Sequence, residues 1–306
     1  MDESVMTEKI LITGANGFTG KHACHYFSKK GMKVIAAVRR DNNICNHSVK
    51  QAVCDLTKKN EIELLLRKEK PYYILHLAGQ NDVSKSWNHP HLTMETNAFA
   101  TLHLLDAVRQ ENFPCKIIVV TSALQYDMKI DKYPPHPYSL SKSGQCMSSG
   151  FCCEFFSLEI FIAKPNNLIG PGDSNGVCSL IAKKIVDYEN NKSKDPIVIN
   201  DSSIHRDFLD VRDAVKAYDY LFQRGKRNEI YNVASGKSQS LGDLIYIYRE
   251  LSNTNFPVSI KKSSKEISPV QVDISKLKAL GWSPRIPFRT SLQDILDYYR
   301  KKAVKK

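Results

Sequence analysis

Short apolar runs alternate with longer amphipathic stretches through the first half of the chain. The apolar runs have the length of buried strands, and the amphipathic stretches have the spacing of helices with one buried face. This alternation predicts βαβ units and a parallel sheet. The predicted strands cover 9–12, 33–38, 72–77, 116–120 and 159–163, and the predicted helices cover 19–30, 60–70, 93–110 and 138–158.

The pattern changes in the second half of the chain. A loop rich in Asn, Gly and Pro covers 165–172, followed by short strands at 196–200 and 256–261 and helices at 177–188, 241–252 and 291–302. We therefore predict an α/β fold: a doubly wound parallel (Rossmann) sheet with a smaller mixed α/β C-terminal domain. The dinucleotide-binding domain is expected over 1–165, with 210–233 returning to it, and the substrate-binding domain over 166–209 and 234–306.

The composition is typical of a soluble globular protein, with 42% hydrophobic and 25% charged residues in a chain of 306. No apolar run approaches the roughly 18 residues that span a bilayer. Residues 1–9 are polar and lack the basic start and apolar middle of a secretory signal. We therefore expect a cytoplasmic protein with no membrane partner.

The formal net charge of +12 has two explanations that the sequence leaves open. One is a solvated basic surface, and the other is a field that attracts anionic ligands such as a dinucleotide and a sugar diphosphate. The sequence has no basic stripe interleaved with aromatic residues and no zinc-finger or RNA-binding pattern. Nucleic acid is therefore not expected as a partner.

The cysteines and histidines point to neither disulfides nor a metal. Eight cysteines are scattered without a Cys-x-x-Cys pair, which suits a reducing compartment. The nine histidines show no spacing typical of metal ligands, so no metal site is predicted.

A glycine-rich turn follows the first predicted strand and opens the first predicted helix. It has the sequence Thr-Gly-Ala-Asn-Gly-Phe-Thr-Gly over 13–20. In this context Gly14 permits a tight turn, Gly17 lets the backbone approach a pyrophosphate, and Gly20 allows close helix–strand packing. The phosphates then face the amides at the helix N-terminus, where the helix dipole favours negative charge. The predicted cofactor contacts in this turn are Gly14, Asn16, Gly17, Phe18, Thr19 and Gly20.

The end of the second predicted strand indicates which cofactor is used. The strand ends in Arg39 and Arg40. Arg39 stands where an Asp or Glu would hold the ribose 2′-hydroxyl of NAD, and an Arg there accommodates the 2′-phosphate of NADP. Asp41 is adjacent, so NAD stays open as the less favoured cofactor. Asp55 and Leu56 fall where a third turn would meet the adenine, although a helix cap explains Asp55 equally well.

Tyr138 and Lys142 form a candidate proton-transfer pair. They are four residues apart in a predicted helix, so their side chains share one face. A free tyrosine has a pKa of about 10, and a nearby ammonium and an oxidised nicotinamide stabilise its phenolate. Hydride transfer at a carbinol carbon needs such a proton partner for the oxygen. The alternative is an ordinary surface helix, on which this spacing is common.

Ser122 decides between these alternatives. It directly follows the apolar strand 116–120, and ligands bind at the carboxyl ends of central strands in a doubly wound sheet. A hydroxyl there would hydrogen-bond the substrate oxygen beside Tyr138, whereas on its own Ser122 would be only a turn former. The ordered set of glycine turn, strand-end serine and Tyr/Lys pair favours the catalytic interpretation.

Over nearly its whole length the chain resembles the extended short-chain dehydrogenases/reductases that modify nucleotide sugars, the NAD-dependent epimerase/dehydratase family. Within that family the strongest likeness is to GDP-4-keto-6-deoxy-mannose reductases, and it lies in 164–172 and 206–213. The other supporting segments are 13–20, His-Leu-Ala-Gly-Gln over 76–80, Asn97, 120–126, Tyr-Ser-Leu-Ser-Lys over 138–142 and Tyr-Asn-Val-Ala-Ser-Gly over 231–236.

The resemblance implies roles for individual residues. Ser122, Tyr138 and Lys142 match the family's catalytic triad. The implied cofactor contacts are Leu77, Ala78 and Gln80, with Tyr138, Lys142 and Pro165 at the nicotinamide end. The implied substrate contacts are Gln80, Ser122, Asn167 and Arg206, the last two holding the diphosphate. A forked guanidinium suits phosphate oxygens, although a salt bridge from Arg206 to Asp207 or Asp210 is an alternative.

One departure from the family pattern bears on the reaction. Nucleotide-sugar 4,6-dehydratases carry an acidic pair after the serine, and here those positions are Ala123 and Leu124. Without a carboxyl group at these positions, dehydration is not expected. The resemblance also implies a homodimer, because relatives often pair through the helices that contain Asn97 and Tyr138.

We therefore predict an NADP-dependent oxidoreductase that reduces the 4-keto group of a nucleotide-linked 4-keto-6-deoxyhexose, a GDP- or UDP-sugar, with NADPH. A nucleotide-sugar 4-epimerase with bound NAD is the nearest alternative. A non-catalytic sensor or scaffold that binds NADP is the second, and the presence of all three triad residues counts against it.

Overall fold

The computed structural model describes residues 8–41, 49–126, 132–261 and 271–304. The chain divides into two compact units: unit 1 comprises Met1–Pro165 and Tyr218–Tyr231, and unit 2 comprises Asn166–Ala217 and Asn232–Lys306. The segment that returns to unit 1 is shorter at both ends than the expected 210–233. The assignment of the two units to cofactor and substrate stays a prediction.

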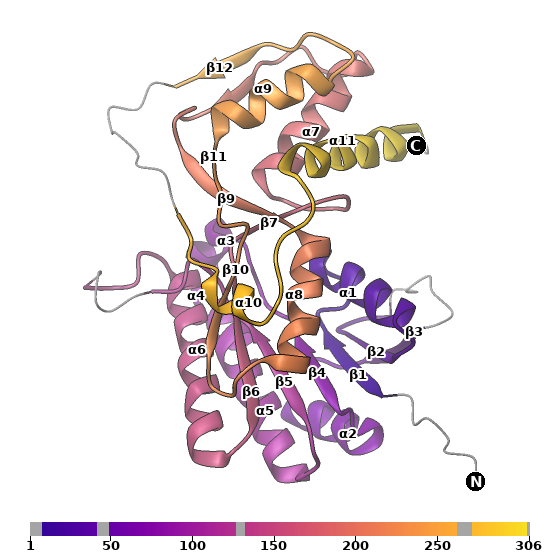
Figure 1. Cartoon of the computed structure of the whole chain (residues 1–306), viewed down its shortest axis with the longest axis vertical. Coiled ribbons are helices and arrows are strands. Elements are labelled where there is room, and N and C mark those ends of the chain that lie inside the picture. The colour runs from indigo at the N-terminus through magenta and orange to yellow at the C-terminus, as the bar shows by residue number, and fades with distance from the viewer. Residues whose placement is uncertain (1–7, 42–48, 127–131, 262–270, 305–306) are drawn as a thin grey trace. The chain divides into compact units, whose positions relative to one another are not determined.

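A seven-stranded sheet forms the centre of the first unit (Figure 1). Its order is β10-β6-β5-β4-β1-β2-β3, and the registered neighbours from β6 to β3 are all parallel. This confirms the predicted doubly wound fold class. The strands are β1 (Lys9–Thr13), β2 (Lys33–Val38), β3 (Val49–Val53), β4 (Tyr73–His76), β5 (Lys116–Val120), β6 (Glu159–Pro165) and β10 (Ile230–Val233).

The strand order reverses between β1 and β4. From β1 the chain proceeds outward to β2 and β3, and then crosses back to β4 on the other side of β1. Ligands of doubly wound sheets bind at this point, outside the carboxyl ends of the strands. The glycine turn 13–20 follows β1 and the segment 76–80 follows β4, so the fold places both at this reversal.

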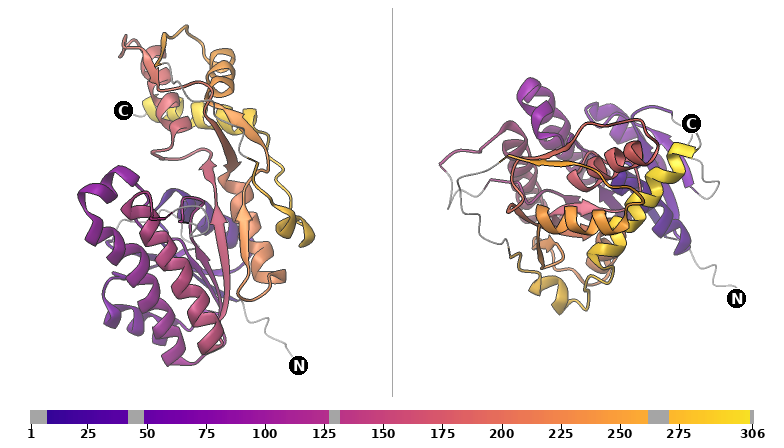
Figure 2. Two further views of the ribbon diagram at one scale, coloured as in Figure 1. Left: turned by 90° about the vertical axis from the view of Figure 1, so that its left-hand side faces the viewer. Right: turned by 90° about the horizontal axis from the view of Figure 1, so that it is seen from above.

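Helices pack on the sheet through apolar faces. α2, α5 and α6 form a continuous layer, as Figures 1 and 2 show, and α1 lies against β1 and β2. The core between them is built from residues such as Leu11, Ile74, Leu104, Ile117 and Ile160, all fully buried. The helices are α1 (Phe18–Lys29), α2 (Lys59–Glu69), α3 (Val83–Asn88), α4 (Pro90–Met94), η1 (Glu95–Phe99), α5 (Ala100–Glu111) and α6 (Pro137–Phe156). The chain passes from the second unit into the first within α8 (Val211–Arg224).

The helix expected over 93–110 is interrupted by a π-helical turn, η1. The side chain of Thr101 donates to the carbonyl of Asn97 at 2.6 Å, and the Asn97 side chain is engaged outside the helix. Such turns are frequent at functional sites because they add one residue to a helix and redirect a side chain. The apolar periodicity gave no sign of this turn.

The second unit has its own core and two small sheets. The three-stranded sheet has the order β11-β9-β7, in which β7 is parallel and β11 antiparallel to β9, and β12 pairs in parallel with β8. The strands are β7 (Asn167–Ile169), β8 (Ile197–Ile199), β9 (His205–Asp210), β11 (Ser238–Ser240) and β12 (Val258–Ile260), and the helices are α7 (Val177–Glu189), α9 (Leu241–Leu251), α10 (Ser275–Ala279) and α11 (Phe288–Val304).

The expectation of a loop over 165–172 was wrong at its centre, because β7 lies within it. The strand is short and its flanks hold Pro and Gly, but Asn167 and Ile169 register with Phe208 and Asp210 of β9. This segment is a strand because it pairs with β9, and its local composition does not predict that pairing.

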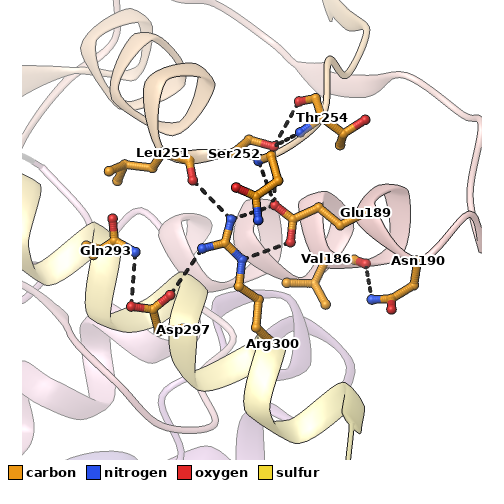
Figure 3. A network of polar contacts seen from close by, with 10 residues as sticks. Val186, Glu189, Asn190, Leu251, Ser252, Thr254, Gln293, Asp297 and Arg300 are labelled. Carbon is orange, nitrogen blue, oxygen red and sulfur yellow. Dashed lines mark hydrogen bonds and ion pairs between the residues drawn. The ribbon is translucent and has the colours of Figure 1, made fainter.

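Arg300 of α11 ties three helices of this unit together (Figure 3). Its guanidinium donates to both carboxylate oxygens of Glu189 on α7, at 2.9 and 2.6 Å, and to the carbonyl of Leu251 at the end of α9 at 3.0 Å. Asp297 accepts a further bond at 3.1 Å. Because the pair is mostly shielded from solvent, it is worth more than an exposed ion pair. No helix among the described residues is long and apolar enough to cross a membrane.

Candidate functional site

The glycine turn leaves the start of α1 open for an anion. Gly17 is the N-cap, and neither a side-chain cap nor an acidic residue serves the first turn of the helix. Gly14 has φ +65°, which favours glycine, and a Cβ there would lie 2.8 Å from the amide nitrogen of Ala78. A Cβ on Gly20 would lie 2.7 Å from the Cα of Ala15. The turn is thus packed as closely as a pyrophosphate-binding turn requires. Asn16, Phe18 and Thr19 are half-buried in the same turn.

The ends of β2 and β3 present charged groups next to this turn. Arg39 and Arg40 are exposed and form no ion pair with any described residue. Asp41 accepts from the Gln51 side chain at 2.5 Å. Asp55 accepts from the backbone and side chain of Thr57 at 3.0 and 2.9 Å, and its carboxyl pKa is lowered. Both carboxylates therefore have hydrogen-bond partners nearby. Neither guanidinium group is held in an ion pair with a described residue, although Arg39 lies close enough to Asp55 to contribute to the lowering of its pKa. Leu56 lies beside Asp55 and is half-buried.

The segment after β4 joins the glycine turn to α6. The amide of Ala78 donates to Thr13 Oγ1 at 3.1 Å, and the amide of Gln80 donates to Asn97 Oδ1 at 2.7 Å. The Gln80 side chain donates to Asp82 O in the same loop and to Thr93 Oγ1 of α4. Leu77 and Ala78 are half-buried.

Ser122 and Tyr138 meet at the carboxyl end of β5. Ser122 Oγ accepts the amide of Leu124 at 3.1 Å, so its hydroxyl hydrogen can be donated to Tyr138. The two side chains share a hydrogen bond, which lowers the Tyr138 pKa, but burial outweighs it and raises that pKa above its ordinary value. Tyr138 sits in the first turn of α6, whose N-cap His136 accepts the amide of Ser139 at 2.9 Å.

Lys142 lies one turn further along α6 with its ammonium buried. Nζ donates to the carbonyl of Val120 at 3.1 Å and to Gln145 Oε1 at 2.8 Å. Burial lowers the Lys142 pKa to about 7, so the group titrates near neutral pH. A Cβ on Gly79 would lie 3.5 Å from Nζ, so the segment after β4 passes directly beside it.

The structure therefore brings together the serine, tyrosine and lysine that the sequence singled out, and it places the glycine turn next to them through Ala78 and Gly79. Such a cluster can hold a carbonyl oxygen, deliver a proton to it and tune that proton with a nearby cation. No cluster of three or more potential metal-ligating side chains occurs in the part of the chain that the structure describes.

Pro165 ends β6 beside this cluster, and its carbonyl accepts the amide of Ala123 at 2.9 Å. Of the four predicted substrate contacts, Asn167 and Arg206 belong to the second unit, whereas Gln80 and Ser122 belong to the first. Asn167 donates through its side chain to Asp207 O at 3.0 Å. Arg206 is exposed, and neither acid proposed as its alternative partner pairs with it. Asp207 instead accepts the amides of Ser235 and Gly236, and Asp210 pairs with Arg212.

Sequence reasoning missed the buried polar residues behind Lys142. His76, Thr101 and Gln145 are all fully buried and hydrogen-bonded to one another or to the lysine. The polar His76 inside an otherwise apolar strand was the one available signal. The sequence contains no signal for Gln145, because a glutamine in a polar helical segment is common and its partners are known only from the fold.

The chain belongs to the NAD dependent epimerase/dehydratase family, whose model matches residues 10–234. It is thus a member of a family of NAD(P)-dependent oxidoreductases, epimerases and dehydratases, as its resemblance indicated.

The proteins that this chain resembles include a reductase and a putative epimerase of nucleotide sugars. The chain is 27% identical to a GDP-6-deoxy-D-mannose reductase of Pseudomonas aeruginosa, over 95% of this chain and 97% of that protein. It is 26% identical to a putative UDP-glucose 4-epimerase of Methanocaldococcus jannaschii, over 95% of this chain and 98% of that protein. A solved structure of RMD from Pseudomonas aeruginosa complexed with NADPH superposes with a TM-score of 0.81 at 25% identity, covering 97% of this chain and 100% of that one.

Proposed function

We propose that this protein reduces the 4-keto group of a nucleotide-linked 4-keto-6-deoxyhexose with NADPH. The observation that carries the proposal is the cluster of Ser122, Tyr138 and Lys142 beside the glycine turn. The likeness to a GDP-6-deoxy-D-mannose reductase over nearly the whole of both chains supports it. The product would be a 6-deoxyhexose nucleotide.

Each residue of the cluster has one task in this reaction. Ser122 turns its hydroxyl hydrogen from Tyr138 to the carbonyl oxygen of the substrate and orients the carbonyl group. Tyr138 protonates that oxygen as negative charge develops on it, and the protonated Lys142 stabilises the resulting phenolate. The bound nicotinamide supplies the hydride. Removing the proton donor is expected to cost about 10²–10⁴ in rate.

NADP is the proposed cofactor, with the amides at the start of α1 holding the pyrophosphate. Arg39 and Arg40 are available for a 2′-phosphate, whereas Asp41, the residue that would hold the 2′-hydroxyl of NAD, is engaged by Gln51. RMD, which resembles this chain in sequence and fold, is described in complex with NADPH. These observations favour NADP over NAD.

Asn167 and Arg206 are the proposed ligands of the substrate diphosphate. Arg206 suits this role because its guanidinium is exposed and its neighbouring acids are bound elsewhere. The apolar Ala123 and Leu124 after Ser122 leave no acid for elimination, which argues against a dehydratase.

A homodimer is proposed on the basis of α6. Leu140, Met147, Phe151 and Phe155 follow the spacing of one helix face, and their exposed fractions are 46%, 65%, 51% and 69%. An exposed apolar row of this kind is typical of a protein–protein contact. Pairing of two copies through this face would bury it.

A nucleotide-sugar 4-epimerase is the second candidate function, favoured by the 26% identity to a putative UDP-glucose 4-epimerase. An epimerase re-reduces its own sugar intermediate and consumes no cofactor. The test is a panel of GDP- and UDP-linked 4-keto-6-deoxy sugars, made in situ by dehydratases, with NADPH loss followed optically and product stereochemistry by NMR. Stoichiometric NADPH loss supports the reductase. Retention of NAD by the purified protein, no NADPH loss with any keto-sugar, and interconversion of the C4 epimers of a GDP- or UDP-sugar that carries a 4-hydroxyl group would support the epimerase.

A further inference from the structure

A chain of buried hydrogen bonds runs from Lys142 away from the candidate site. Gln145 Oε1 accepts from Lys142 Nζ at 2.8 Å, and Gln145 Nε2 donates to Thr101 Oγ1 at 2.9 Å. Thr101 Oγ1 is also 2.8 Å from His76 Nε2, and His76 Nδ1 is 2.8 Å from Thr13 Oγ1. The chain thus starts at the lysine and ends at the strand β1 that leads into the glycine turn.

The hydrogens of this chain have one consistent arrangement. Thr101 has a single hydroxyl hydrogen, and it is directed to the carbonyl of Asn97 at 2.6 Å. Thr101 Oγ1 can therefore only accept from its other neighbours, so His76 carries its hydrogen on Nε2 and accepts at Nδ1 from Thr13. The Thr13 oxygen in turn accepts the amide of Ala78. The neutral His76 that this requires agrees with burial, which lowers its pKa to about 3.

The same count fixes the orientation of the Gln145 amide. Because Thr101 Oγ1 cannot donate to it, Gln145 must turn its NH₂ group toward Thr101 and its carbonyl oxygen toward Lys142. A flipped amide would point NH₂ at an ammonium and a carbonyl oxygen at an acceptor, which leaves two buried polar contacts unsatisfied. The network therefore holds an acceptor against Lys142 at all times.

We propose that Gln145 is a positioning residue that, locked by Thr101 and His76, holds the Lys142 ammonium in place and sets the pH range over which it stays protonated. Gln145 is fully buried, so it acts through the lysine alone. The inference rests on the proposed function only for its effect on turnover, since the charge state of Lys142 can be measured without a substrate.

No charged group pairs with Lys142 among the described residues, so a neutral acceptor such as Gln145 Oε1 has a large effect on the Lys142 pKa. His76 on β4 lies close enough to act on it electrostatically and is neutral. Tyr138 lies on the same helix, and η1 and α5 contribute the neutral Asn97 and Thr101. Within the described residues no carboxylate pairs with Lys142, and α3, α4 and β6 supply no ion pair to it. Its charge is therefore held by two neutral carbonyl oxygens, of which one belongs to Gln145.

Two near-isosteric replacements of Gln145 test this proposal, because they are expected to shift the Lys142 pKa in opposite directions. Gln145→Glu puts a carboxylate against the ammonium, which raises the Lys142 pKa by about one unit or more. The Thr101 hydroxyl must then turn from the carbonyl of Asn97 to donate to the second carboxylate oxygen. Gln145→Met removes the acceptor and lowers the pKa. The measurement is the ¹³Cε resonance of Lys142 in lysine-labelled protein against pH, assigned by its loss in Lys142→Arg. The alkaline limb of kcat/KM is expected to move in the same two directions, because turnover needs the protonated lysine.

A second pair of variants separates the network from packing. Thr101→Ser keeps the hydroxyl and loses a methyl group, whereas Thr101→Val keeps the shape and loses the hydroxyl. We expect the serine variant to retain the native titration of Lys142 and the valine variant to lower it, because the Gln145 amide is then free to turn. A role in packing alone predicts the reverse order of damage.

Unchanged titration of Lys142 in both Gln145 variants, or shifts of the same sign, would overturn the proposal. So would a native titration in Thr101→Val, which remains informative if a Gln145 variant fails to fold. Failure of every keto-sugar to react would count against the proposed function and leave the NMR result standing.

Discussion

Gly20 is the position in the glycine turn where a single added methyl group has the least room. A Cβ there would lie 2.7 Å from the Cα of Ala15 and nearer still to the carbonyl oxygen of Gly14, where ordinary van der Waals contact begins at 3.4 Å. Both neighbours are backbone atoms that cannot rotate aside. Gly20→Ala therefore forces α1 away from the turn that would hold the pyrophosphate.

The cost follows from this geometry. Overpacking a tight site costs about 1–3 kcal/mol, and we expect the upper end because no side chain can yield. For a domain of this size that corresponds to a fall in Tm of roughly 6–12 °C. The displaced amides of α1 also no longer donate to the pyrophosphate of the cofactor. The Kd for NADPH is therefore expected to rise more than about tenfold, a loss of about 1.4 kcal/mol of binding free energy.

The assays are thermal unfolding and the fluorescence of NADPH on titration with protein. Gly31→Ala is the matched control: no atom lies within 4 Å of its added Cβ, and its φ of +87° is strained for alanine. The control should lose about 1–2 kcal/mol of stability and bind NADPH normally. Native affinity in Gly20→Ala would refute the assignment of this turn to the cofactor.

Three further predictions concern other parts of the chain. Arg39→Ser should weaken NADPH about tenfold and leave NADH within about threefold, since it removes one phosphate fork; equal losses for both cofactors would contradict the 2′-phosphate role. Glu189→Gln should cost about 1–2 kcal/mol at pH 7, measured by denaturant unfolding. Because Arg300 lowers the Glu189 pKa, this contribution is present above the unfolded value of about 4.3 and is lost as pH falls through the lower folded value, so the gap to the native protein should close in acid. Phe155→Asp should convert dimer to monomer in sedimentation, whereas Leu64→Asp on the exposed face of α2 should not; monomeric native protein would contradict the dimer.

Most of the first unit could be predicted from the sequence because its elements are long and buried on known faces. The runs 33–38 and 116–120 coincide with β2 and β5 at both ends, since a parallel strand buried on both sides must be apolar throughout. The helix expected over 138–158 is α6 (Pro137–Phe156), in spite of Gly144 and Gly150. Gly144 is explained by packing: its Cβ would touch that of Ala98 at 3.4 Å.

The parts that escaped prediction depend on contacts between distant residues. β3 has the pattern Val-Lys-Gln-Ala-Val and is recognisable only through its pairing with β2. The π turn contains Asn97, whose side chain accepts the amide of Gln80 and donates to Ser141 Oγ, two residues far away in the chain. The fold determines which residues form such hydrogen bonds, so the local sequence pattern does not predict them.

The candidate site divides in the same way. Ser122, Tyr138 and Lys142 were identified because their residue types and order are chemically informative. The neutral surroundings that hold the Lys142 pKa near 7, and the part of Gln145 in them, appear only once β4, α5 and α6 are assembled.

Replacement of the Tyr138 hydroxyl tests the central claim most directly. Tyr138→Phe keeps the ring and removes the proton that the reduction delivers to the sugar oxygen. With NADPH and a reactive 4-keto-6-deoxy nucleotide sugar, kcat is predicted to fall by about 10²–10⁴, while the Kd for NADPH changes little. Turnover at the native rate in this variant would contradict the account.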